Sequence, residues 1–329
     1  MAINDMQQLL RRKDLKIDNA TERRICQALL QRLEKDKSND VQTIAVACIS
    51  DAVKICRDEQ IAAMCDKLTA KIVQIDVEDM RDIYSIGLKT LIKVVPEKEG
   101  IGEIVTKHTV SRLLRGTKST NETMRGECFD LLSELLRKFG EEVTESHDDI
   151  INVVMNEMEK SRDEDGEKFN NIRKRAIECL GALSLSMSGE KLSNVLRNLM
   201  AKMNQDIKKG SSVLAYVHAI VVSTDQIGNR LGQYVDALVP LLFSALENGN
   251  SNEEDSKEDD FDDMGDTMMM SETDCELREL CMNAFGLFIS NCPLDVKSHI
   301  DRIVEVCLKF VSYVVCLCAC HFCLIHLTL

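Results

Sequence analysis

The feature that most constrains this chain is an apolar pattern that returns about every 40 residues. Five segments share apolar or small residues at offsets 0, 4, 7, 8, 11, 12 and 15 from an anchor. These offsets trace one face of an α-helix. Successive anchors lie 39, 44, 48, 41 and 64 residues apart. The five anchors, and a weaker sixth between the last two, are Val41, Met80, Met124, Ile172, Val213 and Leu277.

A second amphipathic helix fits beside each of these helices, at about 21–35, 58–75, 101–115, 147–160, 188–203, 230–247 and 296–311. Two helices in each interval is the HEAT or armadillo period. One helix pair cannot bury its apolar faces alone, so pairs stack into a continuous core. The sequence therefore predicts an all-α, HEAT/armadillo-type right-handed α-solenoid of antiparallel helix pairs. An opening helix at about 2–12 occupies the place of a second helix, and its mate would precede Met1.

The neighbours of the anchors carry further signals. Polar residues precede four of them, and their side chains accept hydrogen bonds from the free N–H groups of a first turn. We expect these residues to be the N-caps: Asp40, Asp79, Thr123 and Asn171. For the residues that follow the five anchors we favour a ladder between stacked repeats over contact with a partner: Gln42, Arg81, Arg125, Arg173 and Arg278.

Composition excludes several alternatives. Three prolines and 15 glycines are too few for an all-β sandwich or barrel. Aromatic residues make up 4% of the chain and Trp is absent, which disfavours a stacking platform for single strands. The net charge of −14 opposes binding to phosphate backbones. We therefore expect no nucleic-acid partner.

Catalytic motifs are missing from the sequence. It contains no Gly-x-Gly-x-x-Gly, phosphate loop, nucleophile elbow or His-Glu-x-x-His. The sequence thus predicts a protein that is not an enzyme, with no cofactor, no metal and no small-molecule substrate.

Most of the acidity comes from one insert at 248–274, which holds 11 acids against Lys257 alone. Such a segment cannot offset the entropy of ordering by burying apolar surface. We expect a disordered loop between two helices of one pair, and removing it brings the last repeat interval close to 40 residues.

The chain has 14 cysteines, and its N-terminus lacks the apolar region of a secretory signal. Without secretion a disulfide framework is not expected. Free cysteines pack as small core residues. Six fall in the repeated core register: Cys48, Cys56, Cys128, Cys179, Cys281 and Cys292.

The repeat pattern indicates a solenoid over 1–313, followed by an apolar, Cys-rich tail at 314–329. Residues 310–329 hold no Asp, Glu, Lys or Arg, but four cysteines and two histidines. Three interpretations of this tail compete: a zinc site, a membrane anchor and a non-native ending of the reading frame, of which we favour the last. Alternate cysteines do not match the usual zinc spacing, whereas 20 uncharged residues suffice to span a bilayer. Membrane contact is expected only if this tail anchors.

The run RDIYSIGLKTLI at 81–92 closely resembles the third-repeat region of the CAND family, the cullin-associated, neddylation-dissociated HEAT proteins. Collinear similarities follow the chain from 1 to 313: MAIND at 1–5, DNATERR at 18–24, VQTIAVAC at 41–48, IRKRA at 172–176, NRLGQY at 229–234 and ELRE at 276–279. The chain begins inside what resembles the first repeat, and the acidic insert replaces a shorter link. It therefore resembles the N-terminal quarter of the family.

This resemblance implies a non-enzymatic scaffold in the cytoplasm and nucleus. CAND proteins wrap around cullin–RING ubiquitin ligases that lack the ubiquitin-like modifier, and they exchange the substrate receptors of SCF-type complexes. The N-terminal repeats hold the end of the cullin that carries the RING subunit. The expected partners are thus a cullin and its RING subunit. As contact residues we expect a stripe on the helix after Met80, taken to be exposed: Asp82, Ser85 and Lys89.

Two alternatives remain at this point. A HEAT-type nuclear transport adaptor would bind a Ran-type GTPase and basic cargo, and its acidity would suit that cargo. A membrane-tethered adaptor would use the apolar tail.

Overall fold

The computed structural model describes residues 3–12, 15, 17–36, 38–75, 77–160, 166–209, 213–251 and 272–309. These residues form α-helices, short 3-10 helices and connecting turns, and no strand occurs among them. The chain divides into two compact units, Met1–Leu192 and Ser193–Leu329. The all-α fold that the sequence predicts is confirmed.

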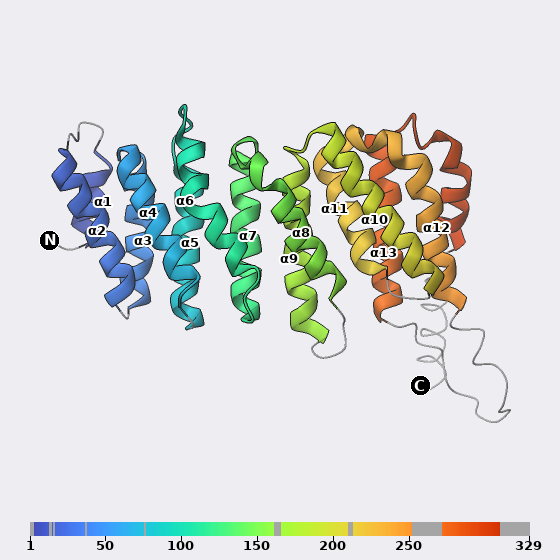
Figure 1. Cartoon of the computed structure of the whole chain (residues 1–329), viewed down its shortest axis with the longest axis horizontal. Helices are drawn as coiled ribbons and strands as arrows, with labels where there is room; N and C mark the ends of the chain where they lie inside the picture. Colours follow the sequence, from blue (N-terminus) through green and yellow to red (C-terminus); the bar gives the residue numbers. More distant parts are fainter. Residues whose placement is uncertain are drawn as a thin grey trace, which may run out of the picture. The chain divides into compact units, whose positions relative to one another are not determined.

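The first unit is built from successive helix hairpins (Figure 1). Its helices are α1 (Ile3–Leu10), α2 (Asn19–Lys35), α3 (Asn39–Val53), α4 (Asp58–Ile72), α5 (Glu78–Val94), α6 (Ile101–Gly116), α7 (Glu122–Phe139), η1 (Glu141–Ser146), α8 (His147–Glu159) and α9 (Gly166–Ser184). Helix α10 (Gly189–Lys209) begins here and continues into the second unit.

The helices of the first unit lie in two rows. Helices α1, α3, α5, α7 and α9 contact one another in that order, and α2, α4, α6 and α8 form the second row. Each helix of the second row also packs against the next helix along the chain, as α4 does against α5. Figure 1 shows these pairs standing side by side from blue to green. This is the stacked-pair arrangement of HEAT repeats.

The repeated apolar register is the core of these rows. In the helices anchored at Met124 and Ile172, α7 and α9, every aligned position is buried. Across all five aligned helices four positions differ. The anchors Val41, Met80 and Leu277 are half-buried, and Ile289 is 41% exposed. The register is therefore confirmed except at Ile289, which lies near the end of its helix.

All six cysteines of the register are buried and free. Burial raises the pKa of Cys128 and of Cys179 to about 12, so both thiols stay protonated. They pack as small apolar residues, as the sequence predicts.

The four expected N-caps lie inside their helices, and for α3, α5 and α7 the N-cap is two residues earlier. Asp40, Asp79 and Thr123 are each the second residue of a helix, and Asn171 lies six residues into α9. Asn121 caps α7 instead, because its Oδ1 accepts a hydrogen bond from the Met124 N–H at 2.9 Å. An acid at the second position still stabilises the positive end of the helix dipole.

The ladder residues after the anchors are buried and reach back to carbonyls at the end of the preceding helix. The exposed fractions of Gln42, Arg81, Arg125 and Arg173 lie between 1% and 8%. Their hydrogen bonds run from Gln42 to Leu33 and Asp36, from Arg81 to Ile75, from Arg125 to Ser119 and Thr120, and from Arg173 to Lys160. A buried donor thus satisfies carbonyl groups that a helix end leaves free. Arg278 is half-buried.

The second unit contains α11 (Leu214–Ile227), η2 (Gly228–Tyr234), α12 (Val235–Ser251), α13 (Glu272–Asn291), η3 (Lys297–His299) and a helical stretch at 300–309. Helix α13 packs against α11 and α12. The rings of Phe243 and Phe285 lie 5.1 Å apart, and the Arg302 guanidinium lies 4.2 Å above Phe243. The expected helix at 230–247 is thus a 3-10 turn followed by α12.

Two segments with expectations attached lie largely outside the described residues. The acidic insert is helical at its edges, since α12 ends at Ser251 and α13 begins at Glu272, while 252–271 are not described. The tail at 314–329 is not described either, so the zinc, anchor and non-native interpretations stay untested. Within the described ranges no helix combines the length and apolar character needed to cross a membrane.

One buried histidine makes the fold sensitive to pH. His147 begins α8 and has no exposed surface, and its Nε2 lies 3.3 Å from the Gly140 carbonyl oxygen. Its Nδ1 is buried without a hydrogen-bond partner. Burial lowers the pKa of His147 below its ordinary value of 6.5. The unfolded chain therefore binds a proton more readily than the folded one.

We predict that the chain loses stability as the pH falls below 6.5, where the unfolded histidine takes up its proton first. The His147→Gln variant removes this titration, so its free energy of unfolding should fall less steeply with pH. Its stability at pH 7.5 should be lower than that of the parent, because glutamine does not fill the space of the imidazole ring. Urea unfolding between pH 7.5 and 5.5 measures both slopes. Equal slopes for parent and variant would contradict the assignment.

The core register predicts a severe effect of Leu132→Asp in α7. Leu132 is fully buried, so the variant places an unpaired carboxylate among apolar side chains. We expect a loss of more than about 3 kcal/mol in the free energy of unfolding. The matched control is Leu294→Asp, because Leu294 is 85% exposed. The control should change the free energy by less than about 0.5 kcal/mol. Similar urea midpoints for the two variants would contradict the register.

Candidate protein-binding surface

The expected contact residues lie on α5, in the row that also holds α3, α7 and α9. The structure brings all three to the side of α5 that faces α7. Asp82 is exposed, Ser85 is 4% exposed, and Lys89 is half-buried. The expectation that the whole stripe is exposed is therefore wrong at Ser85 and only partly met at Lys89.

Ser85 is buried because it belongs to a polar network around Glu127 of α7. Its hydroxyl donates to Glu127 Oε2, while Arg81 Nε donates to Oε1 of the same carboxylate at 3.2 Å. Burial raises the pKa of Glu127, and the neighbouring Asp82 raises it further, while Ser85 and Arg81 lower it. The guanidinium and the carboxylate are 1% and 7% exposed, so this ion pair joins two repeats inside the protein.

A second ion-pair row crosses the surface above this network. Asp130 of α7 lies 3.2 Å from Lys89 Nζ and 3.4 Å from Arg175 Nη1, so one carboxylate links α5, α7 and α9. Nearby pairs repeat the pattern from helix to helix: Lys93 with Glu134 and Arg137 with Glu178. Each partner is at least one quarter exposed, so these pairs contribute little to stability. They cover the row of α5, α7 and α9 with alternating charge.

A lysine near the end of α7 ties two helices together. Lys138 Nζ donates to the carbonyl oxygens of Ile92, Lys93 and Val95 at 2.8–3.0 Å. These carbonyls lie at the C-terminal end of α5, where free acceptors and the negative end of the helix dipole favour a cation. Burial lowers the pKa of Lys138.

Ile86 is an exposed residue of α5 that the expected contact set Asp82, Ser85 and Lys89 does not include. It is 50% exposed and lies on α5 between Asp82 and Lys89. It occupies offset 6 from its anchor, where α7 has Asp130 and α9 has Glu178. The alignment of the repeats could therefore have predicted that Ile86 is exposed, because offsets 6 and 13 lie outside the apolar register. At offset 13 the exposed residues are Lys93, Arg137 and Leu185.

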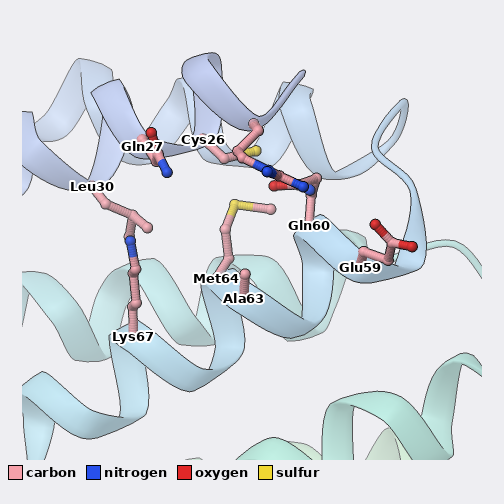
Figure 2. A pocket seen from close by; sticks show the side chains of 9 residues that line it. Cys26, Gln27, Leu30, Glu59, Gln60, Ala63, Met64 and Lys67 are labelled. Carbon is pink, nitrogen blue, oxygen red and sulfur yellow. The ribbon is translucent and has the colours of Figure 1, made fainter. Parts of the chain in front are cut away.

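The second row carries a hollow of about 300 Å³ between α2 and α4. Figure 2 shows Cys26 of α2 and Met64 of α4 turned toward this space, with the amides of Gln27 and Gln60 around it. The full lining is Arg23, Cys26, Gln27, Leu30, Glu59, Gln60, Ala63, Met64 and Lys67. Among the described residues, no three His, Cys, Asp or Glu side chains come together as a metal site.

Comparison with curated proteins shows a likeness to the CAND family. Cullin-associated NEDD8-dissociated protein 1 is 26% identical over 314 residues in Drosophila melanogaster and 29% identical over 319 residues in Dictyostelium discoideum. Cullin-associated NEDD8-dissociated protein 2 of Mus musculus is 24% identical over 319 residues. Each alignment covers 95% of this chain but only 22% or 23% of the relative. The resemblance to a portion of CAND is thus confirmed, and the chain spans less than a quarter of these relatives.

Solved structures show the fold. Kap95p, studied with RanGDP, superposes with a TM-score of 0.58 at 9% identity and covers 92% of this chain and 35% of its own. Importin beta gives 0.57 at 14% identity, covering 94% and 36%. These likenesses identify a HEAT-type α-solenoid, as the sequence predicts. No protein-family model matches the chain.

The network around Glu127 yields a stability prediction. Arg81→Met keeps the length of the side chain but leaves Glu127 buried without its cation. We expect a loss of about 3–5 kcal/mol in the free energy of unfolding. Adding Glu127→Gln should recover part of this loss, because the neutral amide still accepts from Ser85 and no longer needs a counter-charge. Urea unfolding of the single and double variants measures the recovery. Additive losses would show that the two side chains are not coupled.

Proposed function

We propose that this chain is a non-enzymatic protein-binding scaffold that associates with cullin–RING ubiquitin ligases. The observation that carries the proposal is the collinear similarity to cullin-associated NEDD8-dissociated proteins over 95% of the chain. The partners are a cullin and its RING subunit, in the cytoplasm and nucleus. The chain corresponds to the N-terminal part of CAND, which holds the RING end of the cullin, within the wider process of SCF-type assembly and receptor exchange.

The row of α5, α7 and α9 supports this proposal physically. A row of helices with exposed charge and an exposed apolar residue suits a protein partner. Its ion pairs join neighbouring helices, as Lys89 and Arg175 do through Asp130. The buried pair of Arg81 and Glu127 also joins α5 to α7, and a preformed row lowers the entropic cost of binding. Asp82, Ser85 and Lys89 remain proposed contacts, with Ser85 acting by holding Glu127 from inside.

The nuclear transport adaptor is the weaker alternative. The likeness to Kap95p and importin beta is one of fold, at 9% and 14% identity, whereas the curated relatives reach 24–29%. Function resides in surface sites rather than in the fold itself. The alternative therefore rests on architecture that many HEAT proteins share.

A pull-down with the purified 329-residue chain separates the two proposals. We expect it to retain an unmodified cullin with its RING subunit, and to retain less of the same cullin carrying the ubiquitin-like modifier. A Ran-type GTPase with a basic cargo protein is the parallel arm. Retention of the GTPase and cargo without the cullin would replace the proposed function with the adaptor.

Ile86 gives the most direct test of the surface. Ile86→Ser removes an exposed apolar side chain without disturbing an ion pair, so stability should change by less than about 0.5 kcal/mol. We expect the affinity for the cullin–RING complex to fall about tenfold, or about 1.4 kcal/mol. Leu294→Ser is the matched control in the second unit. Titration calorimetry measures both, and equal affinity of parent and Ile86→Ser would remove this row from the interface.

We further expect binding without receptor exchange. Holding one end of a scaffold and releasing an adaptor from the other requires contacts at both ends, and linked contacts gain affinity through effective concentration. The present chain covers 22% of the Drosophila relative. A displacement assay with labelled adaptor on an unmodified cullin should show no release at concentrations that saturate binding. Release by this chain alone would show that the remaining length is dispensable for exchange.

A further inference from the structure

Two cysteines of the first unit lie in direct contact. Cys26 of α2 and Cys56, in the turn between α3 and α4, have their sulfur atoms 3.6 Å apart. Their exposed fractions are 3% and 8%. Within the described part of the chain both are free thiols. The two sulfurs are in van der Waals contact, and a disulfide would require them to approach by about 1.5 Å.

A neighbouring carboxylate holds the two thiols opposite each other. Glu22 lies one turn before Cys26 on the same face of α2, and Arg57 directly follows Cys56. The Arg57 N–H donates to Glu22 Oε1, and Arg57 Nη1 lies 3.2 Å from Oε2. Glu22 is 1% exposed, so this clamp is inside the protein. The turn is thus fixed against α2 in the register that brings the sulfurs together.

The two thiols differ in what surrounds them. Burial disfavours the thiolate at both sulfurs, and the contact between them favours the thiolate at whichever sulfur accepts the hydrogen bond. A thiolate is the nucleophile in thiol oxidation. Cys26 lines the hollow between α2 and α4 and Cys56 does not, so we assign Cys26 as the attacking sulfur and Cys56 as its partner thiol.

Cys26 also has access to small molecules. It lines the hollow between α2 and α4, whose wall includes the amides of Gln27 and Gln60 and the cationic Lys67 (Figure 2). A hollow of about 300 Å³ with polar walls admits a hydroperoxide. The buried Cys65 and Cys128 do not line this hollow.

We propose that Cys26 and Cys56 form an oxidation site at which a hydroperoxide generates a disulfide between α2 and the turn that follows α3. The Cys26 thiolate attacks the outer peroxide oxygen, the O–O bond breaks, and the alcohol (water, for hydrogen peroxide) leaves with a proton. Cys26 becomes a sulfenic acid. The Cys56 sulfur then attacks the Cys26 sulfur, the S–O bond breaks, and water leaves with the Cys56 proton. Two thiols are oxidised and one peroxide is reduced.

Peptide mapping of the whole chain tests this site. The chain is reduced, freed of reductant, exposed to hydrogen peroxide, blocked with N-ethylmaleimide and digested with trypsin. We expect ICQALLQR (25–32) linked to ICR (55–57), lighter by two hydrogen atoms than the two reduced peptides. Mapping by peptide keeps this product apart from oxidation of the exposed Cys275. Absence of the linked peptide when Cys275 is oxidised would overturn the proposal, and so would its formation only in urea.

Variants test the assigned order of the two sulfurs. In Cys56→Ser the sulfenic acid on Cys26 has no partner thiol and should accumulate, so dimedone should label Cys26. In Cys26→Ser, dimedone should leave Cys56 unlabelled. Cys65→Ser is the matched control, a buried cysteine of α4 whose loss should leave the linked peptide unchanged. Equal labelling of Cys56 in Cys26→Ser would overturn the order.

A thermal measurement shows whether the bond forms within the folded protein. A disulfide constrains the unfolded chain, so the oxidised parent should melt at a higher temperature than the reduced parent. Oxidised and reduced Cys56→Ser should melt together. A lower melting temperature for the oxidised parent would show that the bond distorts the fold, which would contradict the geometry argued above.

Discussion

The structure of the first unit depends on buried donors that follow the anchors of its helices. Loops join the two helices of each stacked pair, and they follow helices whose last carbonyls lack partners within the helix. Gln42, Arg81, Arg125 and Arg173 supply the missing hydrogen bonds from inside. A buried guanidinium in turn needs a negative partner, which Glu127 provides for Arg81. The need to satisfy buried polar groups thus explains two features: the hydrogen bonds to free carbonyls at the helix ends, and the ion pair that connects one repeat to the next.

The fold was largely predictable from the sequence because its signal is local and repeated. Seven offsets in five helices identify the core, and the structure buries nearly all of them. Helix starts were less predictable, because several polar residues compete near each one and only geometry selects among them. Asn121 caps α7 whereas the neighbouring Thr123 does not.

The candidate surface was harder to predict because a helix in a stacked row has neighbours on two sides. A stripe at spacings of three and four looks free when the helix is considered alone, but α7 occupies one flank of α5. Ser85 therefore donates a hydrogen bond to Glu127, and Lys89 forms an ion pair with Asp130. Only positions between the two flanks stay open, and Ile86 is one of them. The periodicity of one helix does not show which of its sides a neighbouring helix of the row covers. The alignment of the repeats does contain this information.

This distribution of charge decides what a partner can use. Several acids and bases on the surface of α5, α7 and α9 already pair with one another, so a partner that buries them must remove water from charges whose attraction is satisfied. An exposed apolar side chain carries no such cost, and its burial is favourable in proportion to its area. Affinity on this row is therefore expected to concentrate at Ile86, while the surrounding pairs set orientation and association rate. Kap95p and importin beta share the fold at 9% and 14% identity, so these exposed positions, rather than the solenoid, distinguish one HEAT scaffold from another.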